Sequence, residues 1–210
     1  DLMCNEDATV WIVFNGEIYN FQELRAGLIQ RGHTFRSATD TEVIVHLYEE
    51  HGVECLQHLR GMFAFAIWDA RERVLFLARD RVGIKPLYYC QTENALIFGS
   101  EIKALLVDPE VKREVDLQAV DRFLTFLYLP GAGTMLKGVR KLLPGHYLVV
   151  KNGCVISKQY WDLQFAPDRR WRNLDEAAEA LGDLLKETVN DHMISDVPVG
   201  FLASGGVDST

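Results

Sequence analysis

Four short runs of β-branched and aromatic residues in the middle of the chain constrain the fold most. They cover residues 62–69, 74–79, 87–90 and 95–99, and turn residues separate them. Runs of this length, joined by short connections, are typical of antiparallel strands. The centre of the chain is therefore predicted to form an antiparallel meander.

A strand and two helices are predicted ahead of this meander. Residues 9–14 (TVWIVF) form a buried strand, and Asn15-Gly16 is expected to end it with a turn. Apolar residues at helical spacing predict helices over residues 20–31 and from about Asp40 to near Gly52. A short strand is expected between them at residues 33–37.

The last third of the chain predicts a change of domain. A hairpin is expected over residues 146–161, with Asn152-Gly153 as its turn. A basic linker around residues 165–173 then leads to an amphipathic helix over 174–193 and a buried strand over 197–202. The fold class is thus an α+β domain over residues 1–165, followed over residues 166–210 by the first helix and strand of an α/β domain.

Composition and charge indicate a globular protein and exclude some classes of partner. The chain is 48% hydrophobic and 25% charged, which is ordinary for a globular protein, and its net charge is −8. An acidic chain does not suit nucleic acid, and no apolar run is long enough to span a membrane. The four cysteines form no CxxC pair and the six histidines form no HExxH or HxH. The cysteines are therefore expected to be free thiols, which indicates a reducing compartment, and the protein is predicted to be cytoplasmic.

A glycine turn near the end of the chain has the composition of a phosphate-binding loop. The sequence Ser204-Gly205-Gly206-Val207-Asp208-Ser209 follows the predicted strand. Glycines there let backbone N–H groups point at an anion, and the serine hydroxyls add donors. SGGVDS resembles the loop of ATP pyrophosphatases of the PP-loop type, and with the preceding SDVPVG it is similar to the start of an asparagine synthetase domain. The resemblance implies ATP or pyrophosphate binding by Leu202, Ala203, Ser204, Gly205, Gly206, Asp208 and Ser209, with Asp208 as a ligand of Mg²⁺.

A second motif, Asn15-Gly16-Glu17-Ile18-Tyr19-Asn20, follows the first strand. The Asn15 side-chain amide and the Gly16 backbone N–H are two donors that can form an oxyanion hole, and Glu17 and Asp40 are carboxylates that can receive an ammonium group. NGEIYN resembles the signature of class II glutamine amidotransferases. The resemblance implies an Ntn-hydrolase-type αββα sandwich, an oxyanion role for Asn15 and Gly16, and a glutamine pocket with Glu17 and Asp40.

The two motifs in this order resemble glutamine-hydrolysing asparagine synthetases. The resemblance implies that glutamine, aspartate and ATP are the substrates, with Mg²⁺ as cofactor. Ammonia from glutamine would amidate aspartate through an aspartyl-AMP intermediate, giving asparagine, AMP and pyrophosphate. It is compatible with a homodimer. Two alternatives stay open, namely an amidotransferase for another carboxylate (a cell-surface sugar acid or a β-lactam precursor) and a non-catalytic glutaminase-like binding domain.

The chain is expected to be a fragment cut at both ends. The family nucleophile is an N-terminal cysteine upstream of NGEIYN, and no residue of this chain takes that place. Cys4 is rejected as a substitute, because it stands only eleven positions before Asn15 and no glycine follows it. The chain alone is therefore predicted to be inactive. The charged residues Arg79, Asp80, Arg81 and Lys85 are interpreted as a solvated or ion-paired turn.

Overall fold

The computed structural model describes residues 2–166, 170–171, 173–195 and 197–207. They belong to two compact units, Asp1–Leu163 and Gln164–Thr210. The first unit contains the strands predicted for the centre of the chain and the NGEIYN motif. The second contains the SGGVDS motif.

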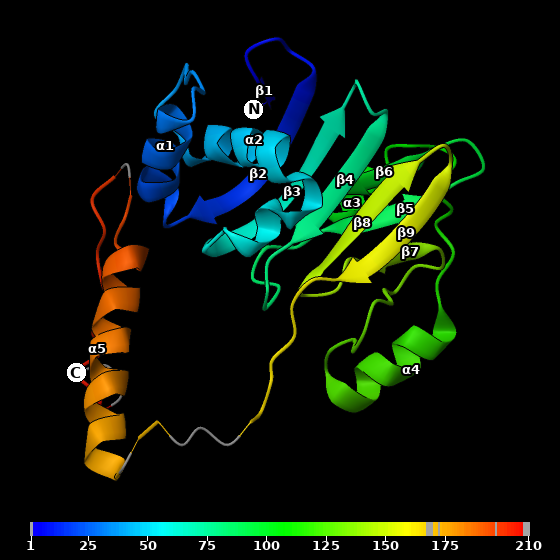
Figure 1. Cartoon of the computed structure of the whole chain (residues 1–210). Coiled ribbons are helices and arrows are strands. Elements are labelled where there is room, and N and C mark those ends of the chain that lie inside the picture. The colour runs from blue at the N-terminus through cyan, green and yellow to red at the C-terminus, as the bar shows by residue number, and fades with distance from the viewer. Residues whose placement is uncertain (1, 167–169, 172, 196, 208–210) are drawn as a thin grey trace. The chain divides into compact units, whose positions relative to one another are not determined.

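A six-stranded antiparallel sheet is the largest element of the first unit (Figure 1). Its core strand β3 has Phe63, Phe65 and Ile67 on one face and Ala64 and Ala66 on the other, all buried. Burial on both faces explains the continuous apolar run in the sequence. The sheet order is β1 (Met3–Cys4), β2 (Val10–Ile18), β3 (Gly61–Asp69), β4 (Val74–Arg79), β8 (His146–Lys151) and β9 (Cys154–Gln159).

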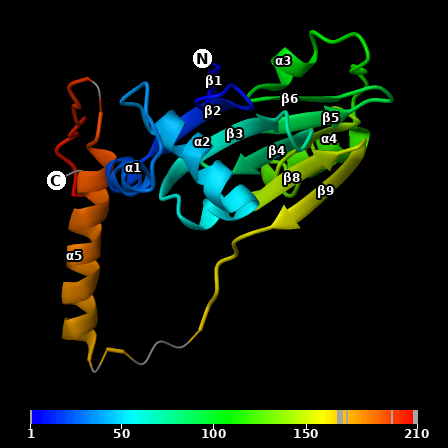
Figure 2. The ribbon, with the colours of Figure 1, turned by 45° about the horizontal axis from the view of Figure 1, so that its top comes forward.

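A smaller, three-stranded antiparallel sheet lies against the large one (Figures 1 and 2). Its order is β6 (Leu96–Gly99), β5 (Tyr88–Gln91) and β7 (Val139–Lys141). Buried Leu77 and Leu148 of the large sheet pack with Leu87 and with Phe98 of β6. This apolar layer joins the two sheets face to face.

Helices cover the outer face of each sheet. The helices α1 (Phe21–Gln30) and α2 (Asp40–His51) lie over the large sheet, where Ile44 joins the cluster of Phe65 and Phe76. Leu105 of the short helix α3 (Ile102–Leu105) packs with Cys90 and Val139 on the small sheet. The layers are therefore helix, sheet, sheet and helix, and the predicted αββα sandwich is confirmed. The remaining elements are η1 (Gly52–Gln57), a 3-10 helix, and α4 (Leu117–Phe126).

Strand β2 continues through the residues that were expected to turn. Asn15 and Gly16 pair with Ala64 and Phe63 of β3, so the prediction of a turn at this point was wrong. The long partner strand offers a complete ladder, and this tertiary pairing overrides the local preference of Asn-Gly.

The short strand expected at residues 33–37 is absent, although the structure describes all of these residues. The backbone N–H groups of Arg36 and Ser37 donate instead to the Glu42 carboxylate, each at 2.7 Å. Because this carboxylate satisfies both donors, the segment does not need a strand partner.

The second unit contains one long helix, α5 (Leu174–His192), whose first turn is capped by the Asn173 side chain. None of its residues is buried. The strand predicted over residues 197–202 is wrong, because these residues are exposed and have no strand conformation. A strand needs a neighbouring strand to satisfy its backbone N–H and C=O groups, and the described residues of this unit provide none.

Among the residues that the structure describes, no helix combines the length and the apolar character needed to cross a membrane.

Candidate functional site

The Asn15 side chain lies between the two sheets, at the point where β6 ends. Its Nδ2 donates a hydrogen bond to Ser100 Oγ at 3.2 Å. Asn15 and Ser100 line a small cavity of about 120 Å³ together with Ala64 and Phe98. Position 15 therefore presents a carboxamide to a space between the sheets.

The backbone N–H of Gly16 points away from β3. Phe63, which lies opposite Gly16, uses both of its backbone groups for Asp80: its C=O accepts from the Asp80 N–H at 2.8 Å, and its N–H donates to Asp80 Oδ2 at 3.3 Å. Gly16 and Phe63 are thus a non-hydrogen-bonded pair, in which the backbone groups of both residues face outward. The Gly16 N–H lies on the edge of β2 that β1 pairs with only at Trp11 and Ile12.

Two glycines make this pairing possible. A Cβ on Gly16 would lie 2.2 Å from the Met62 carbonyl oxygen, and a Cβ on Gly61 would lie 2.1 Å from the Glu17 carbonyl oxygen. Both contacts are with backbone and neither can be relieved by moving a side chain. Glycine at position 16 therefore has a packing reason as well as its exposed N–H.

Asp40 lies at the start of α2 and reaches the same edge of β2. Its Oδ2 accepts a hydrogen bond from the Ile18 N–H at 2.9 Å. Burial raises the pKa of Asp40, although the hydrogen bonds from the Ile18 and Thr41 N–H groups act in the opposite direction. A carboxylate with this burial is stabilised by a cationic partner.

Glu17 is half-buried and pairs with Met62 in the ladder. Side chains alternate along a strand, so Glu17 shares a face of β2 with Asn15. The structure therefore brings Asn15, Gly16, Glu17 and Asp40 to one end of β2. Two donors and two carboxylates there suit a ligand with both a carbonyl and an ammonium group.

Cys4 is not part of this group. It lies in β1 opposite Trp11, four residues before Asn15 along β2. At the rise of a strand, this is a separation of about 13 Å.

The SGGVDS motif belongs to the second unit and is described only in part. Leu202, Ala203, Ser204, Gly205 and Gly206 are exposed, and Gly205 has a φ of +73°. Ser204 Oγ accepts from the Gly206 N–H at 3.4 Å. Asp208 and Ser209, which were predicted to bind phosphate and metal, lie outside the described residues. The glycine conformation fits a phosphate-binding turn, but the described residues form no enclosed site.

The turn that follows β4 was predicted to be solvated or ion-paired, but two of its charged residues, Arg79 and Asp80, bind backbone groups instead. Asp80 is buried, and its carboxylate accepts from the N–H groups of Phe63, Ile84 and Lys85. The Arg79 guanidinium donates to the carbonyl oxygens of Gly83, Lys85 and Leu142. Burial lowers the pKa of Arg79. The charges of Arg79 and Asp80 are held by backbone groups, so the turn has a structural role.

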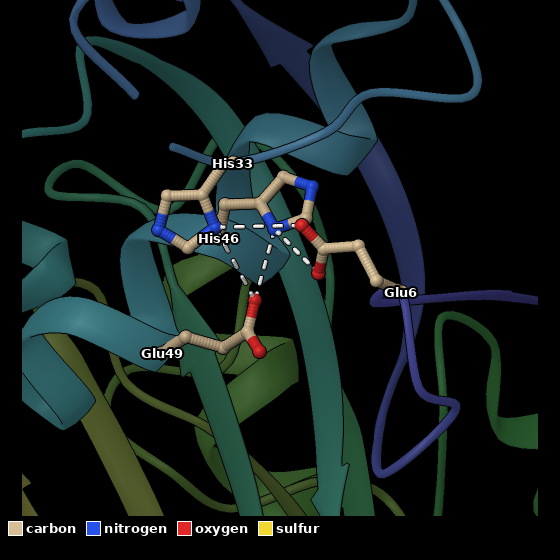
Figure 3. A group of neighbouring side chains, drawn as sticks. All are labelled: Glu6, His33, His46 and Glu49. Carbon is tan, nitrogen blue, oxygen red and sulfur yellow. Dashed lines mark hydrogen bonds and ion pairs between the residues drawn. The ribbon is translucent and has the colours of Figure 1, made fainter. Parts of the chain in front are cut away.

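Two features were missed from the sequence. Ser100, the hydrogen-bond partner of Asn15, stands in the segment FGSE, which gives no chemical signal of its own. A group of histidines and glutamates from separate segments gathers beside α2 (Figure 3). Only the i, i+3 spacing of His46 and Glu49 pointed toward it.

Comparison with known proteins gives two family matches. Residues 2–161 match the glutamine amidotransferase domain, and residues 180–210 match asparagine synthase. Asparagine synthetase [glutamine-hydrolyzing] 1 of Bacillus subtilis is 41% identical over 98% of this chain and 32% of its own length. Amidase chry2 of Gibberella zeae is 35% identical over 98% of this chain and 30% of its own. The chain thus spans about a third of the length of these relatives.

Two solved structures share the fold of the first unit. Glutamine phosphoribosylpyrophosphate amidotransferase from B. subtilis aligns with a TM-score of 0.53 at 20% identity, covering 77% of this chain and 31% of its own. An allosteric regulatory enzyme of purine biosynthesis aligns with a TM-score of 0.54 at 22% identity, covering 77% of this chain and 30% of its own. The likeness to these structures shows the fold alone, and the match over residues 2–161 shows that the chain belongs to the glutamine amidotransferase domain family.

Proposed function

We propose that this chain supplies the glutaminase domain and the first segment of the synthetase domain of a glutamine-hydrolysing asparagine synthetase. The observation that carries the proposal is the order of the two family matches along one chain, residues 2–161 and then 180–210. The domain boundary is proposed near residue 165. Because the chain spans about a third of the length of these relatives, the proposed synthetase activity is that of the whole protein and not of this chain alone.

In the glutaminase step, Asn15 and Gly16 act on the carbonyl oxygen of the glutamine side chain. Their N–H groups donate to the negative charge that develops when a nucleophile attacks the amide. Asp40 receives the α-ammonium group, which compensates the cost of burying this carboxylate. Glu17, on the same face of β2 as Asn15, completes the pocket.

In the synthetase step, the loop from Leu202 to Ser209 binds ATP as a substrate. Its N–H groups and the Ser204 and Ser209 hydroxyls would hold the pyrophosphate, and Asp208 would hold Mg²⁺, which would neutralise phosphate charge. The aspartate carboxylate attacks the α-phosphate of ATP and expels pyrophosphate, and ammonia then displaces AMP from the aspartyl-AMP intermediate. The ammonia must stay unprotonated on its way between the sites, because ammonium has no lone pair with which to attack.

A second candidate is an amidotransferase with a different acceptor. The identity with the amidase of G. zeae, 35% over 98% of this chain, favours keeping it. For either candidate we propose a cytoplasmic homodimer with small-molecule substrates. The net charge of −8 argues against a nucleic-acid partner.

The test uses the full-length protein that contains this chain. Replacing Asn15 by Ala should reduce glutamine-dependent amide formation about 10²–10³-fold, because one oxyanion donor is lost. The rate with ammonium salt as nitrogen source should be unchanged. Asn94→Ala, in an exposed turn, is the control.

The acceptor is identified by measuring AMP and pyrophosphate release with aspartate and with other carboxylates. Release that depends on aspartate supports the proposal. Release with another carboxylate, but not with aspartate, supports the second candidate. Equal glutamine-dependent rates for Asn15→Ala and the unmodified protein would refute the oxyanion role.

A further inference from the structure

Four side chains that the glutaminase site does not use converge beside α2. Glu6 comes from the turn between β1 and β2, His33 from the segment after α1, and His46 and Glu49 from neighbouring turns of α2. One nitrogen or oxygen atom from each lies within 4.8 Å of the others (Figure 3). Three separate segments of the chain thus contribute ligand-type atoms to one point.

The distances fit a four-coordinate metal. His46 Nδ1 lies 2.9 Å from Glu49 Oε2 and 3.6 Å from Glu6 Oε2. His33 Nδ1 lies 3.7 Å from Glu6 Oε1 and 3.8 Å from Glu49 Oε2. Tetrahedral zinc with nitrogen and oxygen ligands about 2.0–2.2 Å away separates those ligands by about 3.3–3.5 Å. One ligand atom from each residue lies within 4.8 Å of the others, so side-chain shifts of about 1 Å or less would bring the four atoms to that geometry.

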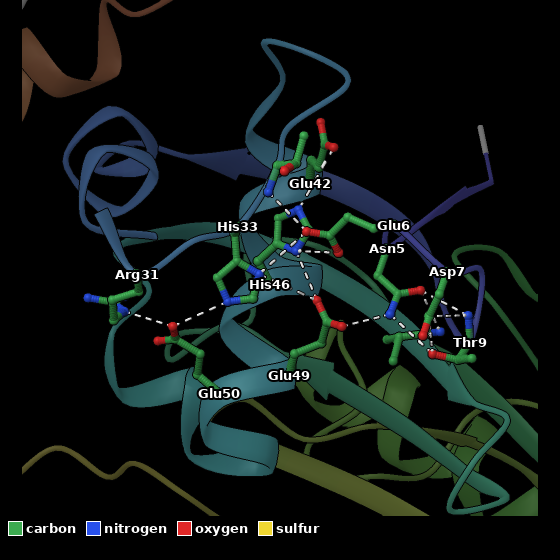
Figure 4. A network of polar contacts seen from close by, with 12 residues as sticks. Asn5, Glu6, Asp7, Thr9, Arg31, His33, Glu42, His46, Glu49 and Glu50 are labelled. Carbon is green, nitrogen blue, oxygen red and sulfur yellow. Dashed lines mark hydrogen bonds and ion pairs between the residues drawn. The ribbon is translucent and has the colours of Figure 1, made fainter. Parts of the chain in front are cut away.

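The partner of His33 leaves the right nitrogen available. His33 Nε2 lies 3.2 Å from Glu50 Oε1, and Arg31 holds the same oxygen at 2.7 Å (Figure 4). A carboxylate facing Nε2 places the proton of the neutral ring there. The lone pair of Nδ1 then faces the two carboxylates of the group with no proton between them.

His46 indicates the same arrangement. Its side chain is fully buried, and its Nε2 has no hydrogen-bond partner, the Glu42 carboxylate being 3.8 Å away. A proton on Nδ1 would leave the Nε2 lone pair buried and facing a carboxylate, which is unfavourable. A cation bound at Nδ1 moves the proton to Nε2, where it faces Glu42.

The two carboxylates are also held in place. Asn5 Nδ2 donates to Glu49 Oε1 at 2.6 Å, which leaves Oε2 directed at the histidines (Figure 4). The Thr34 N–H donates to Glu6 Oε1 at 3.0 Å. With two neutral imidazoles the group has a charge of −2, which a divalent cation balances.

We propose that Glu6, His33, His46 and Glu49 bind one zinc ion. The ligand set of two imidazoles and two carboxylates is closed by protein, as in structural zinc sites. The ion would attach the β1–β2 turn and the segment after α1 to α2, the helix that begins with Asp40.

The test measures zinc binding to the 210-residue chain after treatment with a chelator. We expect one zinc per chain by calorimetry and by elemental analysis. His33→Gln and Glu6→Gln should each weaken binding at least tenfold, because each removes a ligand. Both side chains are partly exposed, at 17% and 37%, so these variants disturb packing less than a change at His46. Circular dichroism checks that they fold.

A matched control removes a nearby histidine outside the group. His58 stacks on His51 at a ring distance of 4.5 Å and is exposed. His58→Gln should bind zinc like the unmodified chain. Zinc should also raise the melting temperature more at pH 7.5 than at pH 5.5, since the imidazoles must be unprotonated to bind it.

Three results would overturn the proposal. They are no stoichiometric zinc uptake by the unmodified chain, full uptake by His33→Gln, or loss of uptake in His58→Gln. Cobalt(II) in place of zinc gives an independent measurement that needs no variant. Its spectrum should show tetrahedral nitrogen and oxygen ligation, whereas thiolate bands would assign the metal to Cys4 or Cys154 and refute the site.

Discussion

The Asp40 carboxylate accepts the Ile18 N–H at 2.9 Å, and this bond joins the first turn of α2 to the edge of β2. Two residues earlier on the same edge lies the N–H of Gly16. The proposed ammonium ligand and one proposed oxyanion donor are therefore fixed relative to each other through a single strand. A shift of α2 along β2 would change the distance between the Asp40 carboxylate and the Gly16 N–H, and with it the length of the amino-acid side chain that the site accepts.

Replacing Asp40 by Asn should weaken the binding of glutamine without lowering the stability of the fold. Burial raises the pKa of Asp40 in the folded protein, so its charged form costs stability as the pH rises above the ordinary Asp value. The variant should lose at least tenfold in glutamine affinity, since a charged partner is removed. Its melting temperature at pH 7 should be equal or higher by at most about 2 °C, because partial exposure screens the charge.

Calorimetry with glutamine and thermal melts at pH 4 and pH 7 check this expectation. The melting temperature of the variant minus that of the unmodified protein should be higher at pH 7 than at pH 4. A variant that melts lower at pH 7 than at pH 4, relative to the unmodified protein, would show that the Asp40 charge stabilises the fold.

Gly16→Ala should destabilise the first unit. Its Cβ would lie 2.2 Å from the Met62 carbonyl oxygen, so β2 and β3 must separate locally. We expect a loss of about 1–3 kcal/mol in the free energy of unfolding, measured by denaturant titration. Gly27→Ala in α1 is the control. Its Cβ meets only the end of the Arg31 side chain, and alanine favours the helix by about 0.5–1 kcal/mol. Equal effects of the two substitutions would contradict the close approach.

Asp80→Ala should cost about 2–4 kcal/mol of unfolding free energy. The carboxylate accepts the N–H groups of Phe63, Ile84 and Lys85, and the substitution leaves these donors without their acceptor. Asp162→Ala, at an exposed site whose carboxylate accepts the neighbouring Leu163 N–H, should change stability by less than about 0.5 kcal/mol. Chemical denaturation of both variants makes the comparison, and a small effect at Asp80 would mean that water replaces the carboxylate.

Helix α5 should exchange its amide protons faster than α2. None of the residues of α5 is buried, whereas α2 buries every residue from Glu42 to Tyr48. Few buried contacts mean a low free energy of local opening. Hydrogen-exchange mass spectrometry of the 210-residue chain should show at least tenfold lower protection across α5. Equal protection would show that α5 is covered in solution.

Local sequence signals predicted most of the first unit. The bounds of β4 agree with the prediction, and Asn152 and Gly153 have the positive φ values of 52° and 76° that a tight hairpin turn requires. Turn chemistry of this kind acts within a few residues and can be read from the sequence. The same Asn-Gly signal at residues 15–16 failed, because β3 supplied a partner along the whole of β2.

The candidate site was only partly accessible from the sequence. The resemblance supplied Asn15, Gly16 and Asp40, but not Ser100, which is 85 residues away from its partner Asn15. Asp80 was interpreted as part of a solvated or ion-paired turn, although it is 1% exposed, because three backbone donors converge on it only in the folded chain. The histidine and glutamate group draws on three segments and has no fixed spacing. Contacts between distant segments are what a single sequence leaves out.

The glycines at positions 16 and 61, on the paired strands β2 and β3, have a consequence for sequence change in this chain. Each lacks the one carbon that would collide with a carbonyl across the ladder, so neither position tolerates a larger residue while the other strand stays in place. In a library covering every substitution, selected only for folded protein, both positions should come back strongly enriched in glycine. The strand edge that presents the Gly16 N–H would then be preserved by the demands of folding, even in variants that never meet a substrate.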